Sequence, residues 1–150
     1  MERIVVFALL LGFATVALAN DGLVSVRSQY SVQQTADRLA SALESRGMRI
    51  FARIDHAAGA ADVGQSLRPT QLVIFGNPRV GTPLMQCSQT TGIDLPQKAL
   101  VWRDADGQVW LTYNDPEYLA NRHVVVGCDA VLDKVKKALA NFAAAAAGGG

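Results

Sequence analysis

The stretch Ile74-Phe75-Gly76-Asn77-Pro78-Arg79-Val80-Gly81-Thr82-Pro83-Leu84-Met85 lies near the middle of the chain and determines how its two halves are joined. The apolar, β-branched run Gln71 to Phe75 leads into it and predicts a buried strand. Gly76, Asn77 and Pro78 end that strand, because glycine accepts positive φ, asparagine bonds its own backbone and proline lacks an N–H. The turn is therefore specified by its residues.

A helix is predicted over residues 82–90, directly after this turn. Thr82 is the expected N-cap, and Pro83 takes the first helical position, where a missing N–H costs nothing. Leu84, Met85 and Ser88 would share one face of this helix.

The segment Met48 to Asp55, on the N-terminal side, alternates between apolar and polar residues and predicts a half-buried strand. His56 to Val63 follows it as a loop or a short helix. This connection is long enough for a crossover, which would make the strand parallel to the central one. The alternation predicts a core face of Met48, Ile50, Ala52 and Ile54, opposite Arg49, Phe51, Arg53 and Asp55.

The remaining segments supply one more strand, a hairpin and three helices. Leu23 to Tyr30 alternates as a strand, and Ser31 with Gln34 forms a capping box for a helix that ends near Gly47. The hairpin joins 98–103 to 108–113 through aspartate-glycine, and helices follow Asp115 and Asp129. The order of these elements predicts an α+β fold: a mainly antiparallel sheet of about five strands with three to four helices packed on one face.

The two ends of the chain differ from the rest in composition. Residues 1–19 have a basic residue, an apolar run and a small-x-small site at Ala17-Leu18-Ala19, a pattern typical of a signal peptide. We therefore expect export to the periplasm or beyond the cell, a single domain over 20–142, and no stable membrane insertion after cleavage. Residues 143–150 are a low-complexity Ala/Gly tail, either a fraying helix end or an expression scar.

Charge limits the partners that the chain is expected to bind. The formal net charge is +1, and the sequence has no block of lysine or arginine. Binding to nucleic acids or to anionic membrane surfaces requires a basic stripe on the protein, so neither is expected as a partner. A small molecule or another protein fits the composition better.

Cys87 and Cys128 are the two cysteines of the sequence. In an exported protein a disulfide is the default, and on the chain-entropy model it would stabilise the fold by about 4 kcal/mol. Two inert thiols, or a metal or redox site, are the alternatives. The metal alternative is weak because the pair lacks Cys-x-x-Cys spacing and His56 lies far from both cysteines in sequence.

Five motifs together resemble the family called domain of unknown function 302, over Tyr30 to about His123. They are Asp55-His56-Ala57-Ala58, Ile74 to Pro78, Gly81 to Met85, Gly92-Ile93-Asp94-Leu95-Pro96 and Trp110 to Pro116. The resemblance implies a compact α+β domain, often in dimers or oligomers, with no agreed activity. Cys87 departs from the family pattern and Cys128 lies beyond its edge, which favours a disulfide gained as a pair.

The candidate binding residues follow two strands. His56 stands beside Asp55 at a strand end, as a general base or hydrogen-bond anchor is often presented, although it could simply cap the next helix. Asn77 is a turn former or a ligand contact. If both strands run parallel, one pocket collects a set of six residues. This set is Asp55, His56, Asn77, Pro78, Thr82 and Met85.

Catalytic and cofactor motifs are missing from the sequence. It has no Gly-x-Ser-x-Gly elbow, no phosphate-binding glycine loop, no His-Glu-x-x-His and no haem-attachment sequence, so we expect no cofactor and no metal. Two hypotheses remain ahead of an enzyme that uses His56. One is a non-catalytic module for a small polar or anionic ligand, and the other is an assembly domain that forms homodimers through a sheet face bearing Phe51, Trp102 or Trp110.

Overall fold

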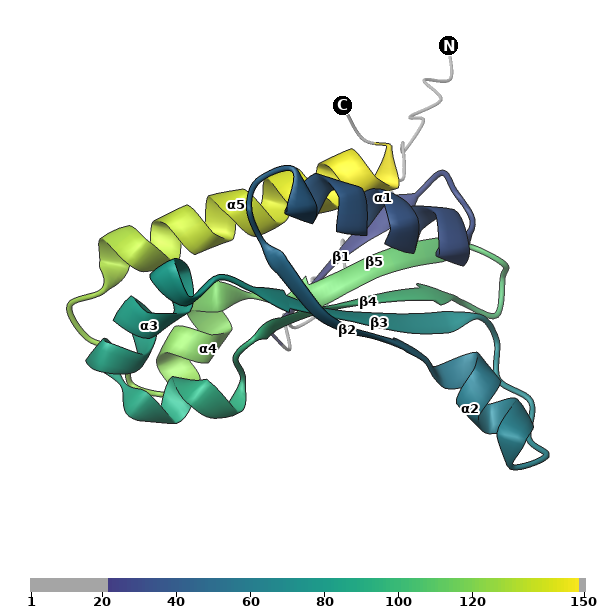
Figure 1. Cartoon of the computed structure of the whole chain (residues 1–150), viewed down its shortest axis with the longest axis horizontal. Coiled ribbons are helices and arrows are strands. Elements are labelled where there is room, and N and C mark those ends of the chain that lie inside the picture. Colours follow the sequence, from purple (N-terminus) through teal and green to yellow (C-terminus); the bar gives the residue numbers. More distant parts are fainter. Residues whose placement is uncertain (1–21, 149–150) are drawn as a thin grey trace, which may run out of the picture.

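A computed structural model describes residues 22–148 (Figure 1). Five strands form one sheet in the order β1-β5-β4-β3-β2, and every neighbouring pair is antiparallel. In chain order the elements are β1 (Leu23–Ser28), α1 (Val32–Glu44), β2 (Arg49–Asp55), α2 (His56–Asp62), β3 (Thr70–Gly76), α3 (Pro78–Cys87), the 3-10 helix η1 (Gln89–Ile93), β4 (Gln97–Arg103), β5 (Val109–Asn114), α4 (Pro116–Arg122) and α5 (Asp129–Ala147). The predicted α+β class is confirmed.

Two helices cover one face of the sheet, and the other face has no helix on it in this part of the chain (Figure 1). The Arg38 guanidinium in α1 donates to the carbonyls of Ala145 and Ala146 in α5, at 2.8 and 3.1 Å. Beneath the two helices lies the core, whose largest fully buried side chains include Phe75, Leu39, Leu43, Leu111, Val73 and Val101. Helices α3 and α4 lie beyond one end of the sheet, and α2 lies beyond the other.

The first helix begins as its sequence predicts. The Ser31 hydroxyl accepts a hydrogen bond from the Gln34 N–H, and the Gln34 side chain accepts one from the Ser31 N–H, both at 3.2 Å. This capping box satisfies two donors that the helix itself leaves free. Val32, Leu39 and Leu43 then face the core, because they recur on one side of the helix.

Helix α3 begins at Pro78, so the prediction that it starts after Thr82 is wrong. Asn77 is its N-cap, and the Asn77 Oδ1 accepts the Arg79 N–H at 2.9 Å. Asparagine is at least as good an N-cap as threonine, and Pro78 is as well suited to the first position as Pro83. The earlier signal therefore determines the start, and Pro83 lies inside the helix.

Strand β2 contains a bulge that its strict alternation conceals. Ile50 pairs with Phe75 and Ala52 with Ile74, which leaves Phe51 as an extra residue between the two pairs. A bulge shifts every later residue to the opposite face. The prediction that Met48, Ile50, Ala52 and Ile54 share the core face is therefore wrong after Phe51.

Arg53 shows the consequence of this shift. It pairs with Val73, a core residue, and so lies on the helix side of the sheet. There its guanidinium forms an ion pair with Asp37 of α1 at 2.7 Å. Ile54, which the alternation placed in the core, is 40% exposed on the uncovered face.

The last helix continues through the alanine run, so the domain extends past residue 142. Ala143, Ala146 and Ala147 are at most 1% exposed. The Gln29 N–H donates to the Ala147 carbonyl at 3.1 Å, which joins the end of α5 to the end of β1. Gly148 ends the helix in the left-handed conformation, with φ of +82°. The alanines permit close approach of the neighbouring elements, and this is why the segment packs instead of fraying.

Cys87 and Cys128 form a disulfide, with a Cα–Cα distance of 6.4 Å. Cys87 is the last residue of α3 and Cys128 the residue before α5. The bond therefore fixes the end of α3 against the start of α5. The expected signal peptide, residues 1–19, lies outside the described residues, and none of the helices described is both long and apolar enough to reach across a bilayer.

Candidate functional site

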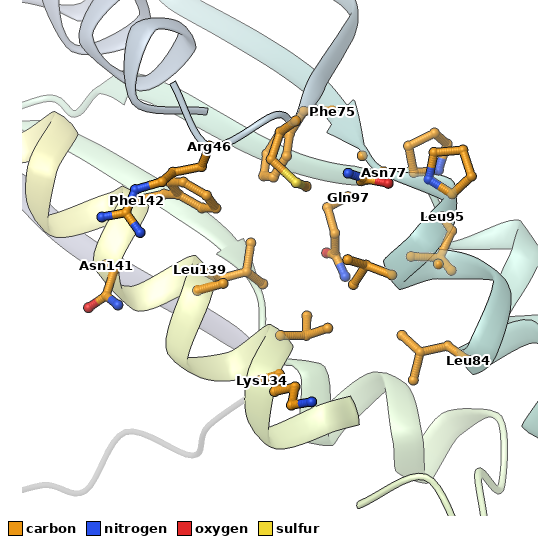
Figure 2. Close-up of a pocket in the computed structure, with 18 of the residues that line it drawn as sticks. Arg46, Phe75, Asn77, Leu84, Leu95, Gln97, Lys134, Leu139, Asn141 and Phe142 are labelled. Carbon is orange, nitrogen blue, oxygen red and sulfur yellow. The ribbon is translucent and has the colours of Figure 1, made fainter. Parts of the chain in front are cut away.

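A cavity of about 840 Å³ opens between α3, α5 and the end of α1, above the sheet end where β3 stops (Figure 2). Helices α3 and α5 form opposite sides of the cavity, and the disulfide connects them. The residues that line the cavity are Ala42, Ser45, Arg46, Met48, Phe51, Phe75, Gly76, Asn77, Pro78, Val80, Gly81, Thr82, Leu84, Met85, Leu95, Pro96, Gln97, Lys134, Val135, Lys137, Ala138, Leu139, Asn141, Phe142 and Ala145.

Apolar side chains from separate elements converge in the interior of this cavity. Phe75 comes from β3, Leu84 from α3 and Leu139 from α5, and each is at most 6% exposed. Figure 2 shows Leu84, Leu95 and Leu139 on different sides of the same space. The bulge adds Phe51, which lies within ordinary contact distance of where a Gly76 side chain would begin. A ligand in this space would contact mostly carbon atoms.

Positive charge lies along one margin of the cavity. Lys134 and Lys137 line it from α5, and Arg46 lines it from the residues after α1. Asn141 continues the same row on α5, beside Phe142 and Arg46 in Figure 2. The three cations form no ion pair with any residue between 22 and 148. No aspartate or glutamate within residues 22–148 lines the cavity.

Gln97 is a polar side chain in an apolar place. It pairs with Phe75 across β3 and β4, so it faces the helices, and it is only 9% exposed. Figure 2 shows its amide between Phe75 and Leu95, directed into the cavity. None of the side-chain hydrogen bonds between described residues includes this amide, and no fully buried polar side-chain atom among them lacks a partner, so the amide opens onto the cavity. The amide is free to bond a ligand or water in the cavity.

Asn77 has a structural role as well as a place in the cavity wall. Besides capping α3, it donates through Nδ2 to the Gly47 carbonyl at 3.1 Å. Both ends of its amide are therefore occupied by backbone, which agrees with the interpretation of Asn77 as a turn former. Pro78, Thr82 and Met85 also line the cavity.

Asp55 and His56 are not in this pocket, because β2 and β3 run antiparallel. Asp55 pairs with Gln71 at one end of the two strands, whereas Arg49 pairs with Gly76 at the other. Strands of this length separate their ends by about 20 Å. The Asp55 carboxylate accepts the Ala58 N–H at 3.0 Å and so caps α2, and His56 is exposed. The predicted common pocket of His56 and Asn77 is therefore wrong.

The second histidine takes part in a cluster away from the cavity. The His123 imidazole bonds the Asp94 carboxylate at 2.5 Å through Nε2 and the Thr90 hydroxyl at 3.0 Å through Nδ1. Asp94 is half-buried. The pocket beside Asp94 measures about 20 Å³, too small for a substrate. The cluster thus joins η1 to the end of α4.

Among the described residues the pKa of four groups is shifted, Asp37, Asp104, Tyr113 and Lys136, and none of the four lines the cavity. Burial raises the pKa of Tyr113, which is 7% exposed. The hydrogen bond from Arg53 lowers the pKa of Asp37. Within residues 22–148 no group of three His, Cys, Asp or Glu side chains is close enough together to hold a metal ion.

Sequence reasoning missed four of the polar residues at the cavity: Arg46, Gln97, Lys134 and Lys137. A signal for Gln97 was available, because it alternates with Ala99 and Val101 and would face the core if the strand began one residue earlier. The two lysines flank the apolar stripe of α5, which is the usual place for a solvated charge. The two lysines lie on the margin of a cavity only because α3 is positioned opposite that stripe.

The comparisons with known proteins agree on the family. The model of the family described as domain of unknown function DUF302 matches residues 24–142. Two curated relatives, both named fluoride-specific ion channel FluC 1, come from Brucella suis and Brucella abortus. Each is 52% identical over 107 residues, which is 71% of this chain but only 42% and 40% of those proteins.

A solved structure supports the fold. The crystal structure of an uncharacterized conserved DUF302 protein from Bacillus stearothermophilus matches with a TM-score of 0.76 and 16% identity. The match covers 84% of this chain and 98% of that protein, so the likeness extends over nearly the whole domain. The family match spans β1 to most of α5, and the chain belongs to the DUF302 family.

Proposed function

We propose that this protein binds a small, largely apolar molecule in the cavity between α3 and α5, without transforming it. The observation that carries the proposal is the cavity itself: about 840 Å³, lined mostly by apolar side chains. Pockets for small ligands measure roughly 300–1,000 Å³ and have predominantly apolar walls with a few polar groups. Gln97 and the residues of the cationic margin are the polar groups here.

The proposal changes the ligand that the sequence suggested. A small polar molecule would leave Phe75, Leu84 and Leu139 against water or against polar atoms, and neither is favourable. An apolar body that fills the same space gains about 25 cal/mol for each square ångström of apolar surface removed from water. The cavity therefore supports a ligand with a substantial apolar part.

The names of the Brucella relatives concern fluoride, but this chain spans less than half of their length. A small hydrated anion gains little from a carbon-lined cavity, since it would lose its hydration there. We therefore propose that the part shared with this chain is a ligand-binding domain attached to the channel proteins, and that the named activity belongs to the rest of them.

Calorimetric titration with 1-decanol, a neutral apolar probe, tests the proposal. We expect saturable binding at one site per chain. Ala138→Phe should abolish it, because Ala138 lines the cavity and the larger ring would occupy the ligand's space. Ala140→Phe is the matched control, since Ala140 is exposed on the same helix and does not line the cavity. Decanol binding that Ala138→Phe leaves unchanged would exclude the cavity as the site.

The uncovered sheet face supports a second candidate function, assembly through a homodimer. Trp102 and Trp110 are cross-strand partners on that face, and Leu72 pairs with Leu100 beside them. These side chains are half-buried, although no helix among the described residues covers them. Exposed apolar patches of this kind often mark interaction surfaces. Phe51, expected on this face, lines the cavity instead.

Sedimentation velocity at increasing protein concentration tests assembly. We expect a dimer that Ile54→Glu dissociates, because Ile54 is 40% exposed on the uncovered face and a charge there would have to be desolvated on contact. His56→Glu is the control, since His56 lies two residues further along the chain and is exposed, but belongs to α2. A wild-type protein that stays monomeric throughout the concentration range would rule out this candidate.

A further inference from the structure

We infer that the ligand of this cavity is an amphipathic anion, with an acyl-like apolar body inside and its anionic head on the margin formed by Arg46, Lys134 and Lys137. The inference rests on the proposed function and adds the class of ligand to it. It follows from the two chemically distinct parts of one cavity: a carbon-lined interior and a margin that carries positive charge only.

The three cations come from two elements that meet at the cavity margin. Lys134 and Lys137 are three residues apart in α5, so their side chains leave the same side of the helix. Arg46 follows α1, whose C-terminal half packs along α5. Asn141 lies one further turn along α5 and offers amide hydrogens on the same margin. A carboxylate or phosphate on this margin would find cationic and amide donors along it.

These cations have no partner in the described protein. None of the four ion pairs within residues 22–148 includes them, and their side chains donate no hydrogen bond there. Glu44 precedes Arg46 by two residues and Asp133 precedes Lys137 by four, yet neither acid lines the cavity or forms an ion pair with these cations among residues 22–148. An anionic head would therefore meet cations that no ion pair among these residues engages.

The position of the charges determines the orientation of the ligand. The lysines and Arg46 are exposed, so an anionic head bound to them keeps much of its hydration. The interior residues Phe75 and Leu139 are at most 5% exposed and would receive the apolar chain. The reverse orientation would bury a charge among carbon atoms, which is strongly unfavourable.

The test compares decanoate with 1-decanol, which has the same chain length and no charge. Titrations are made at low salt with the wild-type chain, with the double variant Lys134→Gln and Lys137→Gln, and with Lys136→Gln. Lys136 is the matched control, because it lies on the same helix but outside the cavity lining, where it pairs with Glu117. We expect the double variant to bind decanoate about tenfold more weakly and decanol with unchanged affinity, since each exposed ion pair contributes modestly.

The outcomes separate the two claims. If neither probe binds the wild-type chain, the proposed function itself fails. If decanol binds and the double variant leaves decanoate affinity within twofold of the wild type, the cavity is a ligand site but the anionic head is wrong. A loss of decanoate affinity in Lys136→Gln as large as in the double variant would also overturn the inference, because net charge would then explain it. Binding to anionic vesicles without binding to decanoate would assign the cations to a membrane surface instead.

Discussion

The two ends of the β2–β3 pair share the same order of elements but differ in their surroundings. At one end Asp55 caps α2, a short helix with no buried residue, and the chain around it faces solvent. At the other end Asn77 caps α3, and this helix forms one wall of the cavity. Each end is a strand followed by a polar cap and a helix. Only the second has α5 and the disulfide opposite it.

The comparison shows that a polar residue at a strand end is insufficient to indicate a site. The side chains of Asp55 and Asn77 each cap a helix, where they accept hydrogen bonds from the backbone N–H groups of Ala58 and Arg79 respectively. What distinguishes the cavity end is packing between elements distant in sequence, namely α3, α5 and the end of α1.

Removing the disulfide should affect the cavity end most. For Cys87→Ala with Cys128→Ala we expect the free energy of unfolding to fall by about 4 kcal/mol, because the bond closes a long loop in the unfolded chain. Urea denaturation measures the loss. Amide hydrogen exchange should accelerate more in α3 than in α1, and equal acceleration in both would contradict a local effect.

The two ends of the strand pair can be compared by Asn77→Ala, which removes the cap of α3, and His56→Ala, which removes the predicted site residue at the other end. Asn77→Ala should lower the free energy of unfolding by about 1–2 kcal/mol, since it removes an N-cap and the bond to the Gly47 carbonyl. His56→Ala should change it by less than about 0.5 kcal/mol, because the side chain is exposed. Thermal or urea unfolding of both variants measures these changes. Equal losses in the free energy of unfolding would refute the contrast between the two ends.

Gln97→Leu should stabilise the protein, by up to about 1 kcal/mol. The substitution replaces an amide that has no partner among the described residues with an apolar side chain of similar size. A substitution that raises stability but weakens ligand binding is a common sign that the position serves function. Gln71→Leu serves as the control, since the Gln71 amide bonds Gln33 and Arg53 and its loss should destabilise.

The Asp37–Arg53 ion pair should give the smallest effect, below about 1 kcal/mol, because the Asp37 side chain is 52% exposed. Its hydrogen bond to Arg53 lowers the folded-state pKa of Asp37 from the ordinary 3.8. The contribution is therefore present above the unfolded pKa and is lost as pH falls through the folded pKa. The stability difference between wild type and Asp37→Asn should be constant above about pH 5 and shrink towards pH 2. A difference that grows on acidification would reverse the assigned sign.

The fold could be predicted in outline because its signals are local. The capping box at Ser31, the aspartate-glycine hairpin and the Asp115 cap each determine an element through neighbouring residues. Errors arose where two local signals competed, as Asn77 and Thr82 did for the start of α3. The bulge at Phe51 was hidden because an alternating pattern looks the same with or without one extra residue.

The site could be predicted only in part because it depends on strand direction. Asn77, Pro78, Thr82 and Met85 follow β3 and do line the cavity, as sequence reasoning grouped them. Asp55 and His56 were added on the assumption of a parallel crossover, and the antiparallel pairing places them at the far end. No local pattern reports which way a strand runs after a connection of this length.

The most direct test of the central claim is a two-dimensional NMR titration of the isotope-labelled chain with decanoate. Our account predicts saturable chemical-shift changes at amides around Phe75, Gln97 and Leu139, which line the cavity from β3, β4 and α5. It predicts no change at His56 in α2 or at Trp102 on the uncovered face. Changes centred on either of those residues, or none anywhere at saturating probe, would contradict the claim that the cavity end is the functional site.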